Sequence, residues 1–312
     1  MTHFTITKPE AGQRLDKFLN TQLPQSSRSQ LQKRIKSGRV TVNGLIPTVH
    51  QFLKVGDRVA IDDVIVSARK PSELPTQPLP IPDIPIVKDT TEYLIINKPA
   101  GVLVHDAPGK HEATVVDFVL RHYPDVAKIG EDPVRPGIVH RIDKDVSGLL
   151  VIAKTQDMFD HLKTQFKSRR VEKWYYALVY GRPQQPNGEI KFNIDRSSTA
   201  DHKMAAVPSQ ERDRGKPALT EFEIIEPLGS YTLLRVRPRT GRTHQIRVHL
   251  NAYGLPIVGD QLYHPKKMKS SLTLDRIFLH AYHLAFPLPD GSRLMVECEL
   301  PKKLAEILDS IR

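Results

Sequence analysis

Apolar residues near the start of the chain recur with a period close to 3.6, the spacing of one face of a helix. This pattern predicts two short helices, over residues 14–23 and 29–37. An alternating segment over residues 38–44 follows and ends in Asn-Gly, a dipeptide typical of tight hairpin turns, and residues 53–61 read as another strand. The first part of the chain, residues 1–65, is therefore expected to form a small α/β domain.

A proline-rich segment separates this domain from the rest of the chain. Six prolines fall between residues 66 and 89. Repeated prolines remove backbone donors and favour extended chain. We therefore expect a linker over residues 66–89 and a second domain over residues 90–312.

The second domain is predicted to be rich in strands. Residues 92–98 and 148–154 are nearly continuous apolar runs, as expected for strands that are buried on both faces. Further strands are predicted over residues 173–180, 189–194, 218–225 and 231–236, and helices over residues 157–169, 243–253 and 304–311. Because several strands follow one another without helices between them, the pattern indicates an α+β domain with a mixed, largely antiparallel sheet.

Basic residues are in excess, and most of the excess lies in the first domain. The net charge is +11, and residues 1–70 carry 12 Lys and Arg against 5 Asp and Glu. Such a surplus favours a polyanionic partner, although a solvated surface explains the charge alone equally well. Basic side chains gather on the second predicted helix and at its exit, where they form a basic face: Arg28, Lys33, Arg34, Lys36 and Arg39.

Other features of the composition narrow the class of protein. The single cysteine, Cys298, excludes an internal disulfide and indicates a reducing compartment, for which we expect the cytoplasm. No run of 18 apolar residues predicts a membrane span, and the first residues do not read as a signal peptide. We expect a monomer with no obligate protein partner.

The most informative segment is residues 135–150, RPGIVHRIDKDVSGLL, in which charged and small residues lead directly into a buried strand. It resembles the His-Arg-Leu-Asp-x-x-Thr-Ser-Gly signature of the RluA/RluD-type family of pseudouridine synthases. Ile142 and Val146 stand where the signature has Leu and Thr. The first replacement conserves volume, whereas the second removes a hydroxyl group.

Four further blocks agree with the same family in order and spacing. They are residues 96–105, 173–179, 240–250 and 278–281. The first domain resembles the S-four type of RNA-binding module, which implies that the residues of its basic face bind RNA. With this domain, the resemblance covers nearly the whole chain. It implies an RNA pseudouridine synthase that acts on structured RNA, with large-subunit (23S) ribosomal RNA as the expected substrate and tRNA as the alternative.

The resemblance also implies roles for individual residues. It makes Asp143 the essential catalytic carboxylate and matches Tyr175 and Arg247 to the active-site tyrosine and arginine. It places Leu279 beneath the target base, and Arg141 where a side chain fills the space that a flipped base leaves. Polar residues of the same motifs are expected to bind substrate: His140, Arg242 and His244.

The chemistry of the reaction fits these residues. Isomerising uridine breaks the C1′–N1 bond, turns the base and forms a C1′–C5 bond, without redox change or phosphate transfer, so we expect no cofactor and no metal. A neighbouring arginine favours the charged form of a carboxyl group. We therefore expect Arg247 to form an ion pair with Asp143. Asp143 then acts either as a nucleophile at C1′ or as a base on the ribose, and both alternatives stay open.

Three other functions were weighed against this one. Asp145 lies two positions from Asp143, a spacing that allows a glycosidase-like carboxylate pair. A non-catalytic RNA-binding protein has no need of Asp143 or Arg247, and both are present. A nuclease usually needs clustered acidic metal ligands, which the sequence does not show, and histidine pairs such as His244 and His249 lack cysteine or carboxylate partners.

Overall fold

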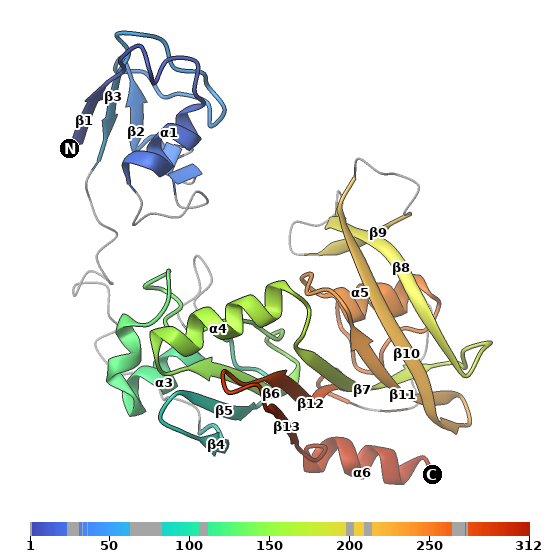
Figure 1. Ribbon diagram of the computed structural model, residues 1–312. Helices are drawn as coiled ribbons and strands as arrows, with labels where there is room; N and C mark the ends of the chain where they lie inside the picture. Colours follow the sequence, from blue (N-terminus) through green and yellow to red (C-terminus); the bar gives the residue numbers. More distant parts are fainter. Residues whose placement is uncertain are drawn as a thin grey trace. The chain divides into compact units, whose positions relative to one another are not determined.

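The computed structural model describes residues 2–23, 31–32, 34–35, 37–62, 83–105, 112–197, 203–208, 214–263, 272 and 274–312. The chain divides into two compact units, Met1–Pro78 and Leu79–Arg312 (Figure 1). The boundary falls within the predicted linker, most of which lies outside the described residues. Each unit is described by itself.

The first unit is a three-stranded antiparallel sheet packed on a helix. The strands lie in the order β1 (Thr2–Thr5), β3 (Arg58–Ile61) and β2 (Val40–Val42). Helix α1 (Leu15–Gln22) buries Leu15, Phe18 and Leu19 in one core with the strands, as its apolar stripe predicts. The unit therefore has a hydrophobic core of its own.

Two other predictions for this unit concern local structure. Asn43 and Gly44 have φ values of 53° and 79°, so the Asn-Gly turn is confirmed. Of the predicted second helix, residues 31, 32, 34 and 35 are helical, residue 37 lies in a turn, and the rest lies outside the described residues. The apolar side chains of Leu31 and Ile35 are buried in the core, which confirms the second stripe.

The second unit is built on one large sheet, in which neighbouring strands follow the order β4-β5-β6-β12-β7-β11-β10-β8-β9, with β13 paired to β12. The described strands are β4 (Ile86–Asp89), β5 (Tyr93–Lys98), β6 (Ser147–Ala153), β7 (Glu172–Tyr180), β8 (Asn187–Arg196), β9 (Met204–Val207), β10 (Lys216–Leu228), β11 (Tyr231–Pro238), β12 (Leu279–Pro287) and β13 (Arg293–Glu297). The described helices are α3 (Val115–His122), the 3-10 helix η2 (Pro124–Lys128), α4 (Gln156–Lys167), α5 (Gln245–Ala252) and α6 (Lys302–Ser310). Among the described pairings only β6 with β12 is parallel, so the predicted α+β class with a largely antiparallel sheet is confirmed.

Two differences from the sequence prediction concern the edges and the centre of this sheet. Residues 86–89 form strand β4, which pairs with β5, so the end of the predicted linker was wrong. The prolines at 82 and 85 precede this strand and do not interrupt it. Strand β12, central in the sheet, was noticed only through a motif at its start, since its histidines mask the apolar pattern.

Strand β6 is buried on both faces, as its continuous apolar run predicts. Leu150 and Ile152 join the core on one face, while Leu149 and Val151 join a second cluster on the other face, under α4. The second residue of this strand, Gly148, has φ 126°, and a Cβ there would lie 2.3 Å from the carbonyl oxygen of Ala281 on β12. Only glycine permits this approach, which fixes the end of the loop that carries Asp143.

Candidate active site

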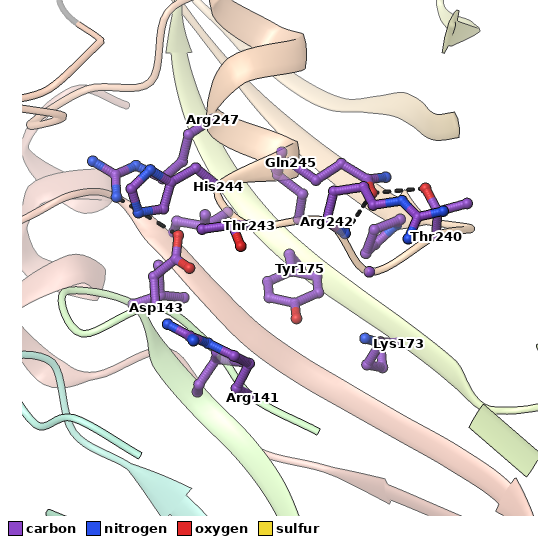
Figure 2. A pocket seen from close by; sticks show the side chains of 16 residues that line it. Arg141, Asp143, Lys173, Tyr175, Thr240, Arg242, Thr243, His244, Gln245 and Arg247 are labelled. Atoms are coloured by element: carbon purple, nitrogen blue, oxygen red, sulfur yellow. Dashed lines mark hydrogen bonds and ion pairs between the residues drawn. The ribbon is translucent and has the colours of Figure 1, made fainter. Parts of the chain in front are cut away.

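A pocket of about 100 Å³ lies where four segments of the second unit meet. These are the loop before β6, the start of β7, the loop between β11 and α5 with the first turn of α5, and the start of β12. Figure 2 shows side chains from the first three converging on one space. The structure brings together most of the residues singled out in the sequence: Arg141, Asp143, Tyr175, Arg242, His244, Arg247 and Leu279.

Arg247 lies between two aspartates. Its Nη1 is 3.6 Å from Oδ2 of Asp143, which is the ion pair expected from the sequence. Its Nε and Nη2 donate to the two carboxylate oxygens of Asp260 at 2.8 and 2.7 Å. The bidentate contact fixes the plane of the guanidinium group and turns its remaining nitrogen toward Asp143.

Burial and charge both act on this arginine. The side chain of Arg247 is 4% exposed and lies over the ring of Tyr263, 5.2 Å from the ring centroid. Burial alone lowers the pKa of Arg247, but the hydrogen bonds and charge of Asp260, followed by the charge of Asp143, raise it above its ordinary value. The guanidinium therefore stays charged and sustains a positive potential beside Asp143, whose side chain remains 18% exposed.

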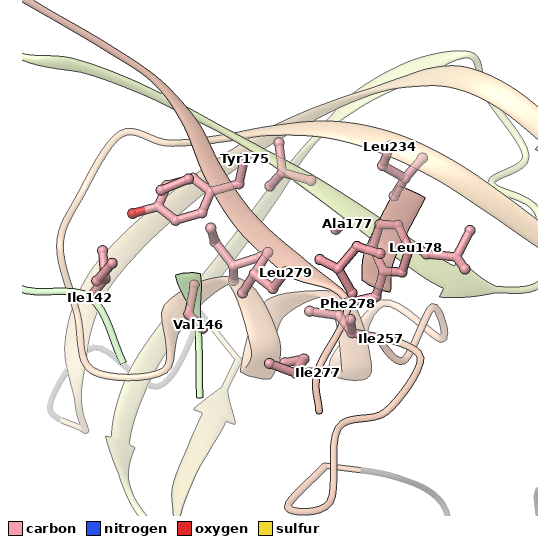
Figure 3. Packing of buried hydrophobic residues seen from close by; sticks show 14 of the residues in the cluster. Ile142, Val146, Tyr175, Ala177, Leu178, Leu234, Ile257, Ile277, Phe278 and Leu279 are labelled. Carbon is pink, nitrogen blue, oxygen red and sulfur yellow. The ribbon is translucent and has the colours of Figure 1, made fainter. Parts of the chain in front are cut away.

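Tyr175 stands over an apolar floor in the pocket. Its ring is buried next to Leu279, and Ile142 and Val146 belong to the same cluster (Figure 3). Burial, and then the charge of Asp143, raise the pKa of the Tyr175 phenol well above its ordinary value, so it keeps its proton near neutral pH. Val146 packs among these apolar side chains, which accounts for a valine where the family signature has threonine.

One glutamine holds the loop that leads into α5. The side-chain oxygen of Gln245 accepts from the Thr240 hydroxyl at 2.7 Å and from the Arg242 backbone N–H at 3.1 Å. Its amide nitrogen donates to the Leu219 carbonyl oxygen at 2.9 Å and to the Thr220 hydroxyl at 3.0 Å. All of its polar atoms are used, so the loop that carries Arg242 is pinned to strand β10.

His244 occupies a strained position before the first turn of α5. Its φ is 54°, in the left-handed region, and its Nδ1 lies 2.8 Å from the hydroxyl of Tyr263. That hydroxyl already accepts the Met204 N–H at 2.9 Å, so its own hydrogen is free to be donated to Nδ1. Burial lowers the pKa of His244. In the neutral ring Nε2 then carries the hydrogen, and His244 offers a donor at the pocket.

A buried lysine, Lys98, holds the loop that carries Asp143 through hydrogen bonds to backbone carbonyl oxygens. Lys98 is fully buried, and its Nζ donates to the carbonyl oxygens of Pro99 and Val102 at 2.8 Å and of Lys144 at 3.0 Å. Gly101 N–H donates to the same Lys144 carbonyl at 2.8 Å. Burial lowers the pKa of Lys98 to about 7. The block that begins at residue 96 therefore positions the loop that carries Asp143 and does not line the pocket.

Two residues near Asp143 do not line the pocket. The ring of His140 stacks on Phe166 with centroids 4.6 Å apart, and its Nε2 accepts the Val151 N–H at 3.1 Å. The ring packs beneath the loop and does not line this pocket, and its expected role in substrate binding stays a prediction. Asp145 is exposed and is not a lining residue, so the glycosidase-like pair of carboxylates is not formed there.

The RNA-binding residues expected in the first unit are only partly described. Arg34 is half-buried and Arg39 is exposed. Arg28 and the side chains of Lys33 and Lys36 lie outside the described residues. Their expected role stays a prediction.

The sequence analysis does not single out Asp260 or Tyr263, and it includes Gln245 only as part of the block over residues 240–250. Asp260 is 2% exposed, and its Oδ1 also accepts the N–H groups of Leu262 and Tyr263 at 2.9 and 3.1 Å. A Gly-Asp dipeptide in a loop is its signal in the sequence, and that signal is weak. Only the fold shows that this carboxylate serves Arg247.

Among the described residues, no group of three or more His, Cys, Asp or Glu side chains is placed to hold a metal ion. No helix in the described part of the chain has the length and apolar character needed to cross a membrane.

Comparison with known proteins identifies the class to which this fold and pocket belong. The family model of RNA pseudouridylate synthases matches residues 92–252, and that of the S4 domain matches residues 13–59. The chain belongs to the RNA pseudouridylate synthase family and carries an N-terminal S4 domain.

Relatives of nearly full length agree with this assignment. A ribosomal large subunit pseudouridine synthase D of Yersinia pestis is 36% identical over 322 residues, which cover 99% of this chain and 94% of that protein. An RNA pseudouridine synthase of Chloroflexus aurantiacus is 42% identical over 288 residues, covering 92% and 86% of the two chains. The solved structure of human RNA Pseudouridylate Synthase Domain Containing 1 matches with a TM-score of 0.58 and 29% identity, covering 72% of this chain and 86% of that one.

Proposed function

We propose that this pseudouridine synthase isomerises uridines in large-subunit ribosomal RNA, with Asp143 as the carboxylate that reacts at the ribose. The observation that carries the proposal is the 3.6 Å contact between Asp143 and a buried, permanently charged Arg247 at the mouth of a pocket. Names of relatives support the choice of RNA, since several are called ribosomal large subunit pseudouridine synthase D.

The proposed reaction begins from the ionised carboxylate of Asp143. As a nucleophile, its oxygen bonds to C1′ while the electrons of the C1′–N1 bond leave with the uracil anion. The base turns, C5 displaces the carboxylate from C1′, and the proton on C5 is finally exchanged for one on N1. As a base, Asp143 instead removes the proton on C2′ while the same bond breaks, which leaves a C1′=C2′ double bond. C5 then bonds to C1′ as Asp143 returns the proton to C2′, and the proton on C5 is again exchanged for one on N1. Both routes need a negative charge on Asp143, which Arg247 stabilises.

The pocket suits a flipped uracil. Leu279 and Val146 form a flat apolar floor, and the Tyr175 ring offers a face on which the base can stack. Because Tyr175 retains its proton, its phenol acts as a donor or as a relay that gives up one proton while it takes another. The N–H of His244 supplies a donor for a uracil carbonyl in this proposal. The exposed side chain of Arg141 is proposed to enter the space that the flipped base leaves in the RNA helix, and its position at the pocket supports this role.

We further infer that the S4 domain adds affinity for RNA and that the protein acts in the cytoplasm as a monomer. The excess of basic residues among the first 70 supports the contribution to RNA affinity. The single cysteine supports the location in the cytoplasm. No metal or organic cofactor is part of the proposed reaction. Chelation with EDTA should therefore leave turnover intact once the folding of the RNA is controlled for.

The experiment that tests the proposal is Asp143→Asn. The variant keeps the size and packing of the side chain but cannot supply the charge, so it should fold with an unchanged circular dichroism spectrum and show no detectable turnover. Pseudouridine mapping of 23S ribosomal RNA from a strain that lacks the gene, complemented with either form, identifies the target. Substantial turnover by Asp143→Asn contradicts the assigned role. Unchanged 23S modification in the deletion strain contradicts the proposed substrate.

A further inference from the structure

A second hollow lies beside the active-site pocket. Its volume is about 450 Å³, and it is bounded by residues 139–141, by the turn between α4 and β7, and by the loop over residues 238–242. Arg141, Lys173 and Arg242 line both hollows, so the two adjoin each other. We call the second hollow the basic groove.

The lining of the basic groove is positive. It includes six Lys and Arg and no Asp or Glu: Arg141, Lys167, Arg169, Lys173, Arg239 and Arg242. Arg239 has an acidic partner, Glu221, at 2.7 Å. Within the described part of the chain the other five make no salt bridge to a carboxylate. Unpaired cations that line one concave surface are suited to an anionic ligand.

The backbone at Arg169 adopts a conformation that favours glycine. Helix α4 ends at Lys167, and the N–H groups of Arg169 and Arg170 donate to the carbonyls of Phe166 and Gln165 at 3.2 and 3.0 Å. This is a Schellman motif, in which the residue at the position of Arg169 adopts a left-handed conformation and is usually glycine. Arg169 has φ 60°. An arginine here is strained where glycine is not, and its side chain is exposed at the groove.

We propose that the basic groove binds backbone phosphates of the RNA strand that flanks the target nucleotide, with Lys167 and Arg169 as the residues that contact them. The proposal rests on the proposed function, because it takes the neighbouring pocket as the site of the flipped base. A base in that pocket places its ribose at the mouth, and the strand must then continue across an adjoining surface. The basic groove adjoins the mouth and shares Arg141 and Arg242 with it.

Lys173 supports the same assignment from the floor of the groove. Its Nζ lies 5.6 Å from the centre of the Phe166 ring, and burial lowers its pKa to about 8. A phosphate in the groove restores an opposite charge next to this amine and favours its charged form.

The test is the salt dependence of RNA binding by the full chain. The probe is a fluorescein-labelled uridine dodecamer, and Kd is measured by anisotropy between 50 and 200 mM KCl. The double variant Lys167→Gln/Arg169→Gln loses two phosphate contacts, so its slope of log Kd against log salt should be smaller by about 1.4. Over that fourfold range the change in Kd then shrinks by roughly sevenfold relative to the parent chain.

A matched control removes the same two charges elsewhere. Lys128→Gln/Arg182→Gln changes one exposed lysine and one exposed arginine, and Arg182 lies just beyond the end of β7 opposite to Lys173. Its slope should equal that of the parent. Equal slopes for the two double variants overturn the proposal, because the groove then contributes no more than general charge.

Two single variants separate phosphate binding from a role in ending the helix. Arg169→Gly removes the strain and should raise Tm while weakening RNA binding, whereas Arg169→Lys should keep the parental slope. Unchanged binding by Arg169→Gly shows a purely structural residue and overturns the proposal. All measurements are made in the Asp143→Asn background, where binding does not depend on turnover. A smaller slope in the double variant together with turnover by Asp143→Asn would contradict the catalytic role of Asp143 but would support phosphate binding by the basic groove.

Discussion

Arg247 reaches Asp143 with only one of its nitrogens, at 3.6 Å, because the other two that it presents are held by Asp260. The arginine is thus held in place by a buried carboxylate and stabilises the charge of one that is partly exposed. This division predicts that charge stabilisation at Asp143 and stability of the fold can be separated by mutation.

The variant Arg247→Met removes the opposite charge from Asp143 and leaves Asp260 buried without its partner. Breaking a buried pair from one side costs about 3–5 kcal/mol. The double variant Arg247→Met/Asp260→Asn keeps an acceptor for the N–H groups of Leu262 and Tyr263. It should recover most of that stability in urea denaturation while remaining nearly inactive.

Residual turnover of the same variants reports on the charge of Asp143. Without the guanidinium, Asp143 loses the neighbouring positive charge that stabilises its negative form, so kcat should fall by roughly 10²–10³-fold. Arg247→Lys keeps a charge but loses the planar fork, and should retain only part of the activity. Parental kcat in Arg247→Met would show that another group stabilises the charge of Asp143.

Tyr175→Phe tests whether the phenol takes part in proton transfer. The ring stays in place against Leu279, so stacking of the base and RNA affinity should change little. If the hydroxyl relays the C5 proton, kcat should fall by roughly 10²–10⁴-fold with little change in KM. A variant with parental kcat would limit Tyr175 to packing. Tyr175→Leu, which loses the flat face as well, serves as the comparison for stacking.

The S4 domain should be separable from the catalytic unit. The first unit has its own core, and residues 1–70 hold 12 Lys and Arg against 5 Asp and Glu. Removing residues 1–78 should leave a folded second unit with weaker RNA binding and a flatter dependence of log Kd on log salt. Equal slopes for the full and shortened chains would mean that this domain holds no phosphates.

How far the sequence predicts this protein depends on what each residue contacts. Periodicity located β6 and α4, since their apolar residues face one core or two, and a motif located Asp143. Strand β12 was not predicted from periodicity because His280 and His283 lie among its apolar residues, although His280 is buried. Asp260 was not predicted because its role depends on a contact with Arg247. The two residues are 13 positions apart, and only the folded loop brings them together.

Buried histidines make the stability of the second unit sensitive to acid. Burial lowers the pKa of His249 and His280 to about 4, and that of His140 lies well below its ordinary value. Each folded-state pKa is below the unfolded value, so between pH 6.5 and 4 the unfolded chain binds more protons. Stability is therefore full above pH 6.5 and is lost as the pH falls through this window.

The variant His249→Phe isolates one of these groups away from the active-site pocket. The ring of His249 is fully buried and meets Phe192 edge to face, with centroids 6.0 Å apart, a geometry that phenylalanine also adopts. Each such proton contributes at most about 1.4 kcal/mol per pH unit to the slope of the free energy of unfolding. The variant should lose up to that much of the slope between pH 6.5 and 4 in urea denaturation, while its stability at pH 8 changes little. An identical slope in both proteins would show that His249 takes up its proton in the folded state as readily as in the unfolded chain.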